Sequence, residues 1–155
     1  MSRKSAPRHR SRQVALQVLY ALDLAKGART TGDRAASVEE TFDRVAENFD
    51  LPEGARAFAK ELACGTTEAQ ATIDQLLTDH AINWRVSRMA TIDRNVLRLA
   101  VFELLHTATP RSVILDEAIE LARRFGTEAS PPFVNGVLDS VAHVLAPGRI
   151  PEEPA

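Results

Sequence analysis

The sequence predicts an all-α protein, and three observations support this fold class. The 155 residues are 45% hydrophobic but only 5% aromatic, and a composition rich in Ala, Leu and Val favours helices over strands. Apolar residues recur at helical spacing along most of the chain, whereas no stretch shows the two-residue alternation of a half-buried strand. Start and stop signals divide the chain into about seven segments. We therefore expect a single domain of about seven helices.

The helix boundaries follow from capping signals, taken in chain order. Ser11 is a candidate N-cap for the first helix, and Ser37 with Glu40 forms a capping box for the second. Ser130 followed by Pro131 is a strong start signal for the last helix, because Pro is favoured at the first helical position. The expected helices span residues 11–26, 37–49, 51–65, 67–80, 90–105, 111–125 and 130–145.

The segment 90–105 is expected to lie at the centre of the fold. It carries two apolar stripes, one continuing from Met89 through Leu99 and the other from Leu97 through Leu105, so it should be buried nearly all round. Its polar residues then share the one remaining strip, which is either solvated or an interface. These polar residues are Asp93, Arg94, Arg98 and Glu103.

Other single residues are interpreted mainly as packing positions. Trp84 is expected to fill the core between helices. Gly136 lies inside the last expected helix, where Gly costs about 1 kcal/mol relative to Ala, so it is expected to permit close helix contact. Phe125 and Phe133 flank a short turn; Phe125 is assigned to the core, whereas Phe133 either packs there or stacks on a nucleobase.

Charge is distributed unevenly along the chain. Residues 1–12 contain five basic residues and no acid, and the remainder contains 14 basic and 21 acidic residues, a net charge of −7. A basic arm on an acidic body indicates either contact with nucleic acid or a disordered solubilising terminus. Arg8, Arg10 and Arg12 would oppose the macrodipole of the first helix, which favours a bound phosphate. We expect a flexible basic arm at 1–10, a helical domain at 11–146 and a mobile tail at 147–155.

Enzymatic chemistry has little support in the sequence. It contains no nucleophile elbow, zinc-protease motif, phosphate-binding loop or dinucleotide fingerprint. Glu103 and His106 match one half of a di-iron helix motif, but no second copy exists, so no metal, cofactor or catalytic residue is predicted. The single Cys64 favours a reducing, cytoplasmic setting, and no apolar run approaches the roughly 20 residues of a membrane span.

Four blocks of the sequence, in this order and spacing, resemble the NusB family of bacterial transcription antitermination factors. They are RQVALQVLY at 12–20, IDRNVLR at 92–98 with FELL at 102–105, DEAIELA at 116–122 with FG at 125–126, and FVNGVLD at 133–139. The likeness covers nearly the whole chain and is most specific in its last block.

The resemblance implies an all-helical protein of two packed subdomains that binds boxA RNA together with NusE, a ribosomal protein. It further implies antitermination in ribosomal RNA operons, with other Nus factors and RNA polymerase as partners, no membrane, and occurrence as a monomer or a homodimer. The residues assigned to RNA are Lys4, Arg8, Arg10, Arg12, Ser130 and Phe133. Those assigned to the partner protein are Tyr20, Asp93, Arg94 and Glu103, whose two acids would attract a basic protein.

Two other functions remain open from the sequence. A similar helical fold occurs as an RNA-binding appendage of ribosomal RNA cytosine methyltransferases, although these 155 residues contain no methyltransferase domain. The chain could also be a structural helical adaptor that binds no RNA. Binding of boxA RNA, with and without NusE, separates these hypotheses.

Overall fold

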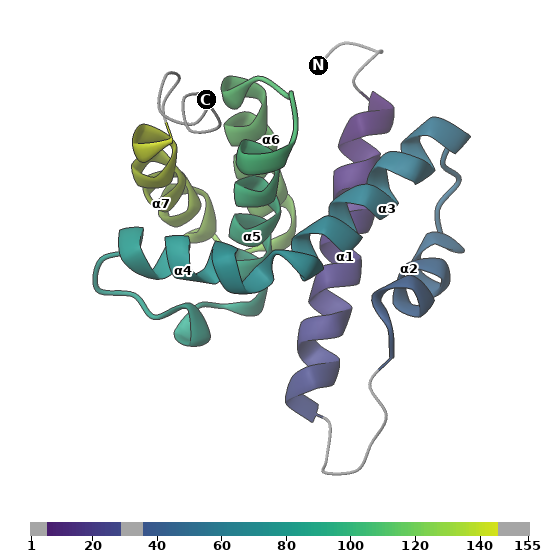
Figure 1. Ribbon diagram of the computed structural model, residues 1–155, viewed down its shortest axis with the longest axis horizontal. Coiled ribbons are helices and arrows are strands. Elements are labelled where there is room, and N and C mark those ends of the chain that lie inside the picture. The colour runs from purple at the N-terminus through teal and green to yellow at the C-terminus, as the bar shows by residue number, and fades with distance from the viewer. Residues whose placement is uncertain (1–5, 29–35, 146–155) are drawn as a thin grey trace. The chain divides into compact units, whose positions relative to one another are not determined.

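The computed structural model describes residues 6–28 and 36–145. Within these residues the chain forms seven α-helices, one 3₁₀ helix and no strand, which confirms the predicted all-α class (Figure 1). The helices are α1 (Ala6–Ala28), α2 (Val38–Ala46), α3 (Glu53–Glu68), α4 (Gln70–His80), η2 (Val86–Arg88), α5 (Thr91–His106), α6 (Arg111–Phe125) and α7 (Ser130–Val144). They divide into two compact units, Met1–Glu68 and Ala69–Ala155. No helix in the described part of the chain is long and apolar enough to cross a membrane.

The first unit contains α1, α2 and α3, each of which contacts the other two. Phe42 of α2 and Leu62 of α3 are fully buried, as is Val18 of α1. Each helix therefore contributes apolar side chains to the buried interior, as amphipathic helices do when they pack on one another.

The capping box predicted at the start of α2 is confirmed. The Glu40 backbone N–H donates to Ser37 Oγ at 3.0 Å, and the Ser37 N–H donates to Glu40 Oε1 at 2.9 Å. Two backbone N–H groups that the helix itself cannot satisfy thus find acceptors.

Replacing Ser37 with Ala should lower the free energy of unfolding by about 1 kcal/mol, because the Glu40 N–H loses its acceptor. Urea unfolding followed by circular dichroism measures this change. Ser112→Ala, at an exposed position in the first turn of α6, is the control and should change stability by less than about 0.5 kcal/mol. Equal effects of the two substitutions would contradict the capping role.

The second unit is built around α5. This helix contacts α4, α6 and α7, and α7 also contacts α4 and α6. All residues from Asn95 to Glu103 are buried. The prediction that the segment 90–105 forms a central, nearly surrounded helix is therefore confirmed.

Helix α1 begins earlier than the sequence signals indicated. It starts at Ala6, so the expected start at Ser11 is wrong by five residues. Pro7 suits the first turn, where its missing N–H would have no partner in the helix. The Ser11 hydroxyl does not cap its own helix; it lies 2.7 Å from the Ala55 carbonyl oxygen of α3 and 2.9 Å from the Pro7 carbonyl oxygen of α1, and it can donate to either. Parts of the predicted arm 1–10 and the whole predicted tail 147–155 lie outside the described residues.

The boundary between α3 and α4 also differs from expectation. Gly65 does not end α3, which continues to Glu68, and Thr67 does not cap α4. Thr67 lies inside α3 and its hydroxyl donates to the Ala63 carbonyl at 2.8 Å. The threonine therefore uses its oxygen within its own helix, and only Ala69 separates the two helices.

Candidate nucleic-acid interface

The N-terminal turns of α1 present cations where a helix favours anions. The first turn contains no acidic residue, and Arg8 and Arg10 are both exposed. Each cation at this end opposes the helix dipole by roughly 0.3–1 kcal/mol. Arg8 and Arg10 thus lie in the turns where the helix dipole is positive, and both features favour an anion such as phosphate.

Phe58 of α3 holds two of these arginines in place. The Arg8 guanidinium carbon lies 3.9 Å from the centre of the Phe58 ring, and that of Arg12 lies 5.4 Å from it. Arg10 donates a hydrogen bond to the Asp50 carbonyl. The structure therefore brings Arg8 and Arg12 together, as the sequence predicted for the arginine cluster, but it anchors them through an aromatic residue that the prediction missed.

Not all of the basic residues assigned to RNA are placed to reach it. Arg12 is only 4% exposed, so its guanidinium serves the packing of α1 on α3 rather than the surface. Its spacing within the arginine cluster gave no sign of this burial. Lys4 lies outside the described residues. Arg8 and Arg10 are the accessible members of the group.

Ser130 holds the turn before α7 and does not face solvent. It is 1% exposed, and its Oγ accepts a hydrogen bond from the Thr127 N–H at 3.0 Å. The chain passes so close here that a Cβ on Gly126 would lie 2.3 Å from Ser130 Oγ and 2.8 Å from the Ala122 carbonyl oxygen. The prediction that Ser130 is the N-cap of α7 is wrong, because Ser130 is the first residue of the helix and Ala129 is its N-cap. The Ser130 hydroxyl is used within the turn, so we do not include it in the proposed RNA surface.

Phe133 and Trp84 form an aromatic pair at the surface of the second unit. Their ring centroids are 5.1 Å apart at an interplanar angle of 66°, an edge-to-face arrangement. Trp84 is 54% exposed, so the prediction that it fills the core is wrong. Phe133 is half-buried. Both rings thus border solvent, as stacking on a nucleobase would require.

Gly136 lies beside this pair on α7 and has no packing role. A Cβ built on it would meet no atom within 4 Å, so the predicted close helix contact is wrong. Gly136 and the two aromatic residues line the same cleft, which has a volume of about 300 Å³. The helix therefore carries the cost of a glycine, about 1 kcal/mol relative to Ala, at a position that borders open space.

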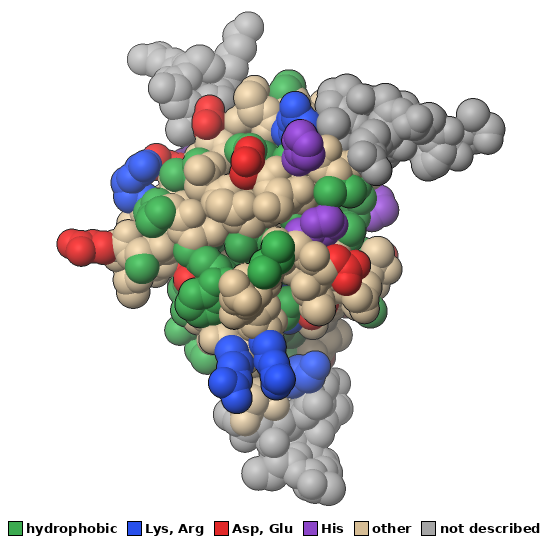
Figure 2. Space-filling view, turned by 90° about the vertical axis from the view of Figure 1, so that its left-hand side faces the viewer, with side chains coloured by type: hydrophobic (Ala, Val, Ile, Leu, Met, Phe, Trp, Pro, Cys, Tyr) green, Lys and Arg blue, Asp and Glu red, His purple; other side chains and the backbone are tan. Residues whose placement is uncertain are grey.

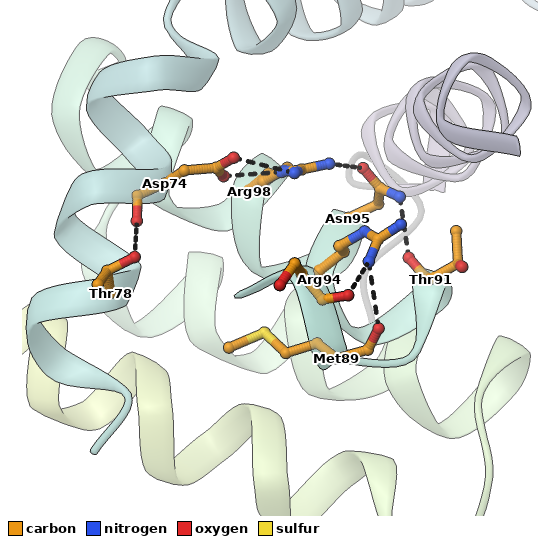
Figure 3. A network of polar contacts seen from close by, with 8 residues as sticks. Asp74, Thr78, Met89, Thr91, Arg94, Asn95 and Arg98 are labelled. Carbon is orange, nitrogen blue, oxygen red and sulfur yellow. Dashed lines mark hydrogen bonds and ion pairs between the residues drawn. The ribbon is translucent and has the colours of Figure 1, made fainter. Parts of the chain in front are cut away.

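Arg98 and Asn95 of α5 form a polar network with Asp74 of α4 (Figure 3). Arg98 donates through Nε to Asp74 Oδ1 at 2.8 Å and through Nη2 to Asp74 Oδ2 at 2.9 Å, a bidentate ion pair. Its Nη1 donates to Asn95 Oδ1 at 3.1 Å, and Asn95 Nδ2 donates to the Thr91 carbonyl at 2.9 Å. The network fixes the register of α4 on α5. Of the two alternatives left open for this strip, a solvated edge does not apply to Arg98, which is buried against α4.

The residues assigned to a partner protein differ in accessibility. Asp93, on the first turn of α5, is half-buried, and its Oδ1 is buried without a hydrogen-bond partner among the described residues. Arg94 is half-buried and donates to the carbonyls of Ser87 and Met89, each at 3.3 Å. Tyr20 is half-buried and belongs to the first unit, whereas the other three belong to the second.

Glu103, also assigned to the partner face, is only 2% exposed, which contradicts the expected surface position. A carboxylate with so little access is a poor contact for a docking protein, since burial of a charge is tolerated only with partners inside the fold. The apolar pattern of α5 could not show that Glu103 is buried, because the burial depends on the other helices that cover α5.

Two further side chains with possible chemistry are Cys64 and His106. Burial raises the pKa of the Cys64 thiol, and the Glu39 carboxylate raises it further; Lys60 lowers the pKa by less than Glu39 raises it, and Glu68 adds a smaller rise. The thiol therefore stays protonated and weakly nucleophilic at neutral pH. His106 stacks on Phe102 at a ring-centroid distance of 5.0 Å. In the described part of the chain, no three His, Cys, Asp or Glu residues could jointly hold a metal ion.

Comparison with known proteins agrees with this description. The NusB family model matches residues 9–143. The chain is 45% identical to the transcription antitermination protein NusB of Anaeromyxobacter dehalogenans strain 2CP-1, covering 92% of this chain and 94% of that one. It is 46% identical to the protein of the same name from Sorangium cellulosum, covering 92% and 95%.

Solved structures show the same fold. The structure of T. maritima NusB has 33% sequence identity and a TM-score of 0.77, covering 89% of this chain and 92% of that one. A structure of the antitermination factors NusB and NusE in complex with double-stranded RNA has 27% identity and a TM-score of 0.76, covering 89% and 97%. These matches confirm the resemblance seen in the sequence and the predicted class of a non-enzymatic transcription antitermination protein: the chain belongs to the NusB family.

Proposed function

We propose that this chain binds boxA-type RNA together with the ribosomal protein NusE in the cytoplasm, and that it thereby promotes antitermination in ribosomal RNA operons. A relative of the same fold has been solved in complex with NusE and RNA. The wider assembly would include other Nus factors and RNA polymerase, and a homodimer is a further state to be tested.

The observation that carries the RNA proposal is the cationic start of α1. Arg8 and Arg10 are exposed in the first turns of a helix whose first turn contains no acid to offset them. A phosphate at this position would interact favourably with the positive end of the helix dipole and would neutralise the arginines at the same time. RNA supplies such phosphates along its backbone, and their neutralisation releases counterions and drives binding.

The protein partner is supported by Asp93. The residue is half-buried on the first turn of α5, so part of its side chain is accessible to a docking protein although Oδ1 itself is buried. A Lys or Arg of a basic ribosomal protein would be attracted by this negative charge. We therefore retain Asp93 and Arg94 of the second unit, and separately Tyr20 of the first unit, as proposed partner contacts and omit the buried Glu103.

The basic site is tested by replacing Arg8 and Arg10 with Gln, which keeps much of each side-chain stem but removes the charge. Affinity for a boxA oligonucleotide should fall, and the slope of log affinity against log salt should become shallower by about 0.7 for each phosphate that is no longer neutralised. Fluorescence anisotropy at several salt concentrations measures both. Deleting residues 1–12 would be less informative, because it also removes the buried Ser11 and Arg12.

Arg44→Gln is the matched control, because Arg44 is an exposed arginine of the same unit on α2. It should leave the salt slope unchanged. Binding is measured with boxA RNA and with a scrambled oligonucleotide, each with and without NusE. Unchanged affinity of the Arg8/Arg10 variant would defeat the assignment of α1 to RNA, and absence of any RNA binding by the intact chain would leave a structural adaptor as the function.

A further inference from the structure

The Phe58 ring lies where α3 packs on α1. It is 7% exposed and follows one helical turn after Ala55, whose carbonyl oxygen lies 2.7 Å from the buried Ser11 hydroxyl of α1. Arg8 and Arg12 are four residues apart, so they lie on the same face of α1 and one ring can contact both. The packing of the two helices therefore fixes the ring against the exposed Arg8 guanidinium.

The ring holds Arg8 without using the groups that an arginine offers to a ligand. The Arg8 guanidinium carbon lies 3.9 Å from the centre of the Phe58 ring, and within the described part of the chain the structure gives Arg8 no hydrogen bond or ion pair. A cation is attracted to the face of a ring without a counter-charge. The N–H donors and the full charge of Arg8 thus remain for an anion.

Arg98 of the second unit shows the contrasting way to fix an arginine. Its guanidinium donates to both carboxylate oxygens of Asp74 and to Asn95 Oδ1, so its charge is compensated and its donors are occupied. A carboxylate holds an arginine firmly, but its negative charge also repels a phosphate. An arginine that must be held in place and still attract an anion therefore requires an aromatic partner.

Exposure alone does not give an arginine this support. Figure 2 views the second unit from the side of α4 and α7 and shows Lys and Arg side chains gathered at one edge of that face. Arg85 and Arg88 are exposed arginines of this unit, and neither contacts an aromatic ring of the described residues. Arg8 differs from them because it is both exposed and in contact with a ring.

We infer that Phe58 is a positioning residue for RNA binding: it holds the Arg8 guanidinium at the positive end of α1, and Arg8 contacts an RNA phosphate while it remains on the ring. The inference rests on the proposed function, since it names how one arginine of the proposed RNA surface is held. Without the ring, the Arg8 side chain samples several rotamers, and only some of them place the guanidinium at the helix end. The apparent affinity then falls in proportion to that fraction.

Phe58→Leu tests the inference because it removes the ring and keeps an apolar side chain in the core. In the wild-type background it should lower the affinity for boxA RNA about fivefold, the factor by which binding weakens when the ligand itself must place one long side chain. In the Arg8→Gln background the same substitution should have no further effect, because the residue that the ring positions is gone. Fluorescence anisotropy gives the four affinities of this cycle.

Phe42→Leu is the matched control. Phe42 is a fully buried ring of the same unit, and Arg56 lies over it at 5.1 Å, but Arg56 is paired with Asp43 at 3.2 Å. The substitution should lower the free energy of unfolding, because it also removes a ring from the core, and should leave RNA affinity unchanged. Phe58→Tyr keeps the aromatic face and should bind RNA as the wild type does.

A second measurement keeps Phe58 in place and so does not depend on the stability of a core variant. The ring current of Phe58 should shift the side-chain proton resonances of Arg8 upfield in the nuclear magnetic resonance spectrum. These resonances are identified by their absence from the spectrum of Arg8→Gln. The shift should persist when boxA RNA is added, because Arg8 remains on the ring; its loss on binding would overturn the inference.

The outcomes separate the inference from the proposed function. If the wild type binds no RNA even with NusE present, both fail. If the wild type binds RNA but Phe58→Leu binds as tightly, or weakens binding equally in the wild-type and Arg8→Gln backgrounds, only the inference is overturned. A loss of RNA affinity in Phe42→Leu as large as that in Phe58→Leu would also overturn it, because Phe58 would then act only through the stability of the fold.

Discussion

Asp74→Ala should lower the free energy of unfolding by about 3 kcal/mol, because it leaves the buried Arg98 guanidinium without its bidentate carboxylate. The Arg98 side chain is 9% exposed and that of Asp74 is 28% exposed, so water can replace only part of the missing interaction. Denaturant unfolding monitored by circular dichroism gives the value.

Asp79→Ala is the control for this substitution. Asp79 lies on the same helix, is exposed, and accepts one hydrogen bond from Gln75 Nε2 at 2.9 Å. Its removal should cost less than about 0.5 kcal/mol, as exposed polar contacts usually do. If Asp74→Ala were no more destabilising than Asp79→Ala, the ion pair would not be what holds α4 on α5.

Asp93→Lys should weaken binding of NusE by about 3 kcal/mol, roughly 100-fold, because a cation would then face the basic partner proposed for this surface. Isothermal titration of purified NusE into the variant measures the weakening. RNA affinity of the isolated chain should hold or improve, since the substitution removes a negative charge from it. Circular dichroism checks the fold, because Lys on the first turn of α5 also opposes the helix dipole.

Asp116→Lys provides the same change of charge at an exposed position of α6 outside the proposed surface and should leave NusE affinity nearly unchanged. Asp93→Asn separates charge from shape and should lie between the wild type and Asp93→Lys. If Asp93→Lys abolished RNA binding and kept its affinity for NusE, the assignment of α1 to RNA and α5 to protein would have to be reversed.

The fold could be predicted from the sequence wherever the determining interactions are local. The capping box joins Ser37 and Glu40, which are only three residues apart in the sequence, and the structure contains it. The apolar stripes of α5 likewise indicated a helix covered on most sides. By contrast, the cap predicted at Ser11 is wrong because α1 begins at Ala6, and the Ser11 hydroxyl lies within hydrogen-bond distance of the Pro7 carbonyl of its own helix and the Ala55 carbonyl of α3.

The site was less predictable because its features depend on what surrounds each residue. The spacing of Arg8, Arg10 and Arg12 predicted a cluster, but only packing on Phe58 decides which arginine is buried. The sequence around Trp84 and Gly136 gave packing interpretations for both, since a large aromatic residue and a helical glycine usually serve the core. Their placement along an open cleft depends on how segments distant in the sequence pack together, and no local sequence pattern indicates it.

The extension of α1 to Ala6 changes how the chain would meet RNA. Arg8 and Arg10 are carried on a formed helix, and the Arg8 side chain already rests on an aromatic ring. Groups that are ordered before binding lose less conformational entropy when a ligand arrives. For these two residues, association should therefore resemble docking onto a rigid surface rather than the folding of a coil around its target.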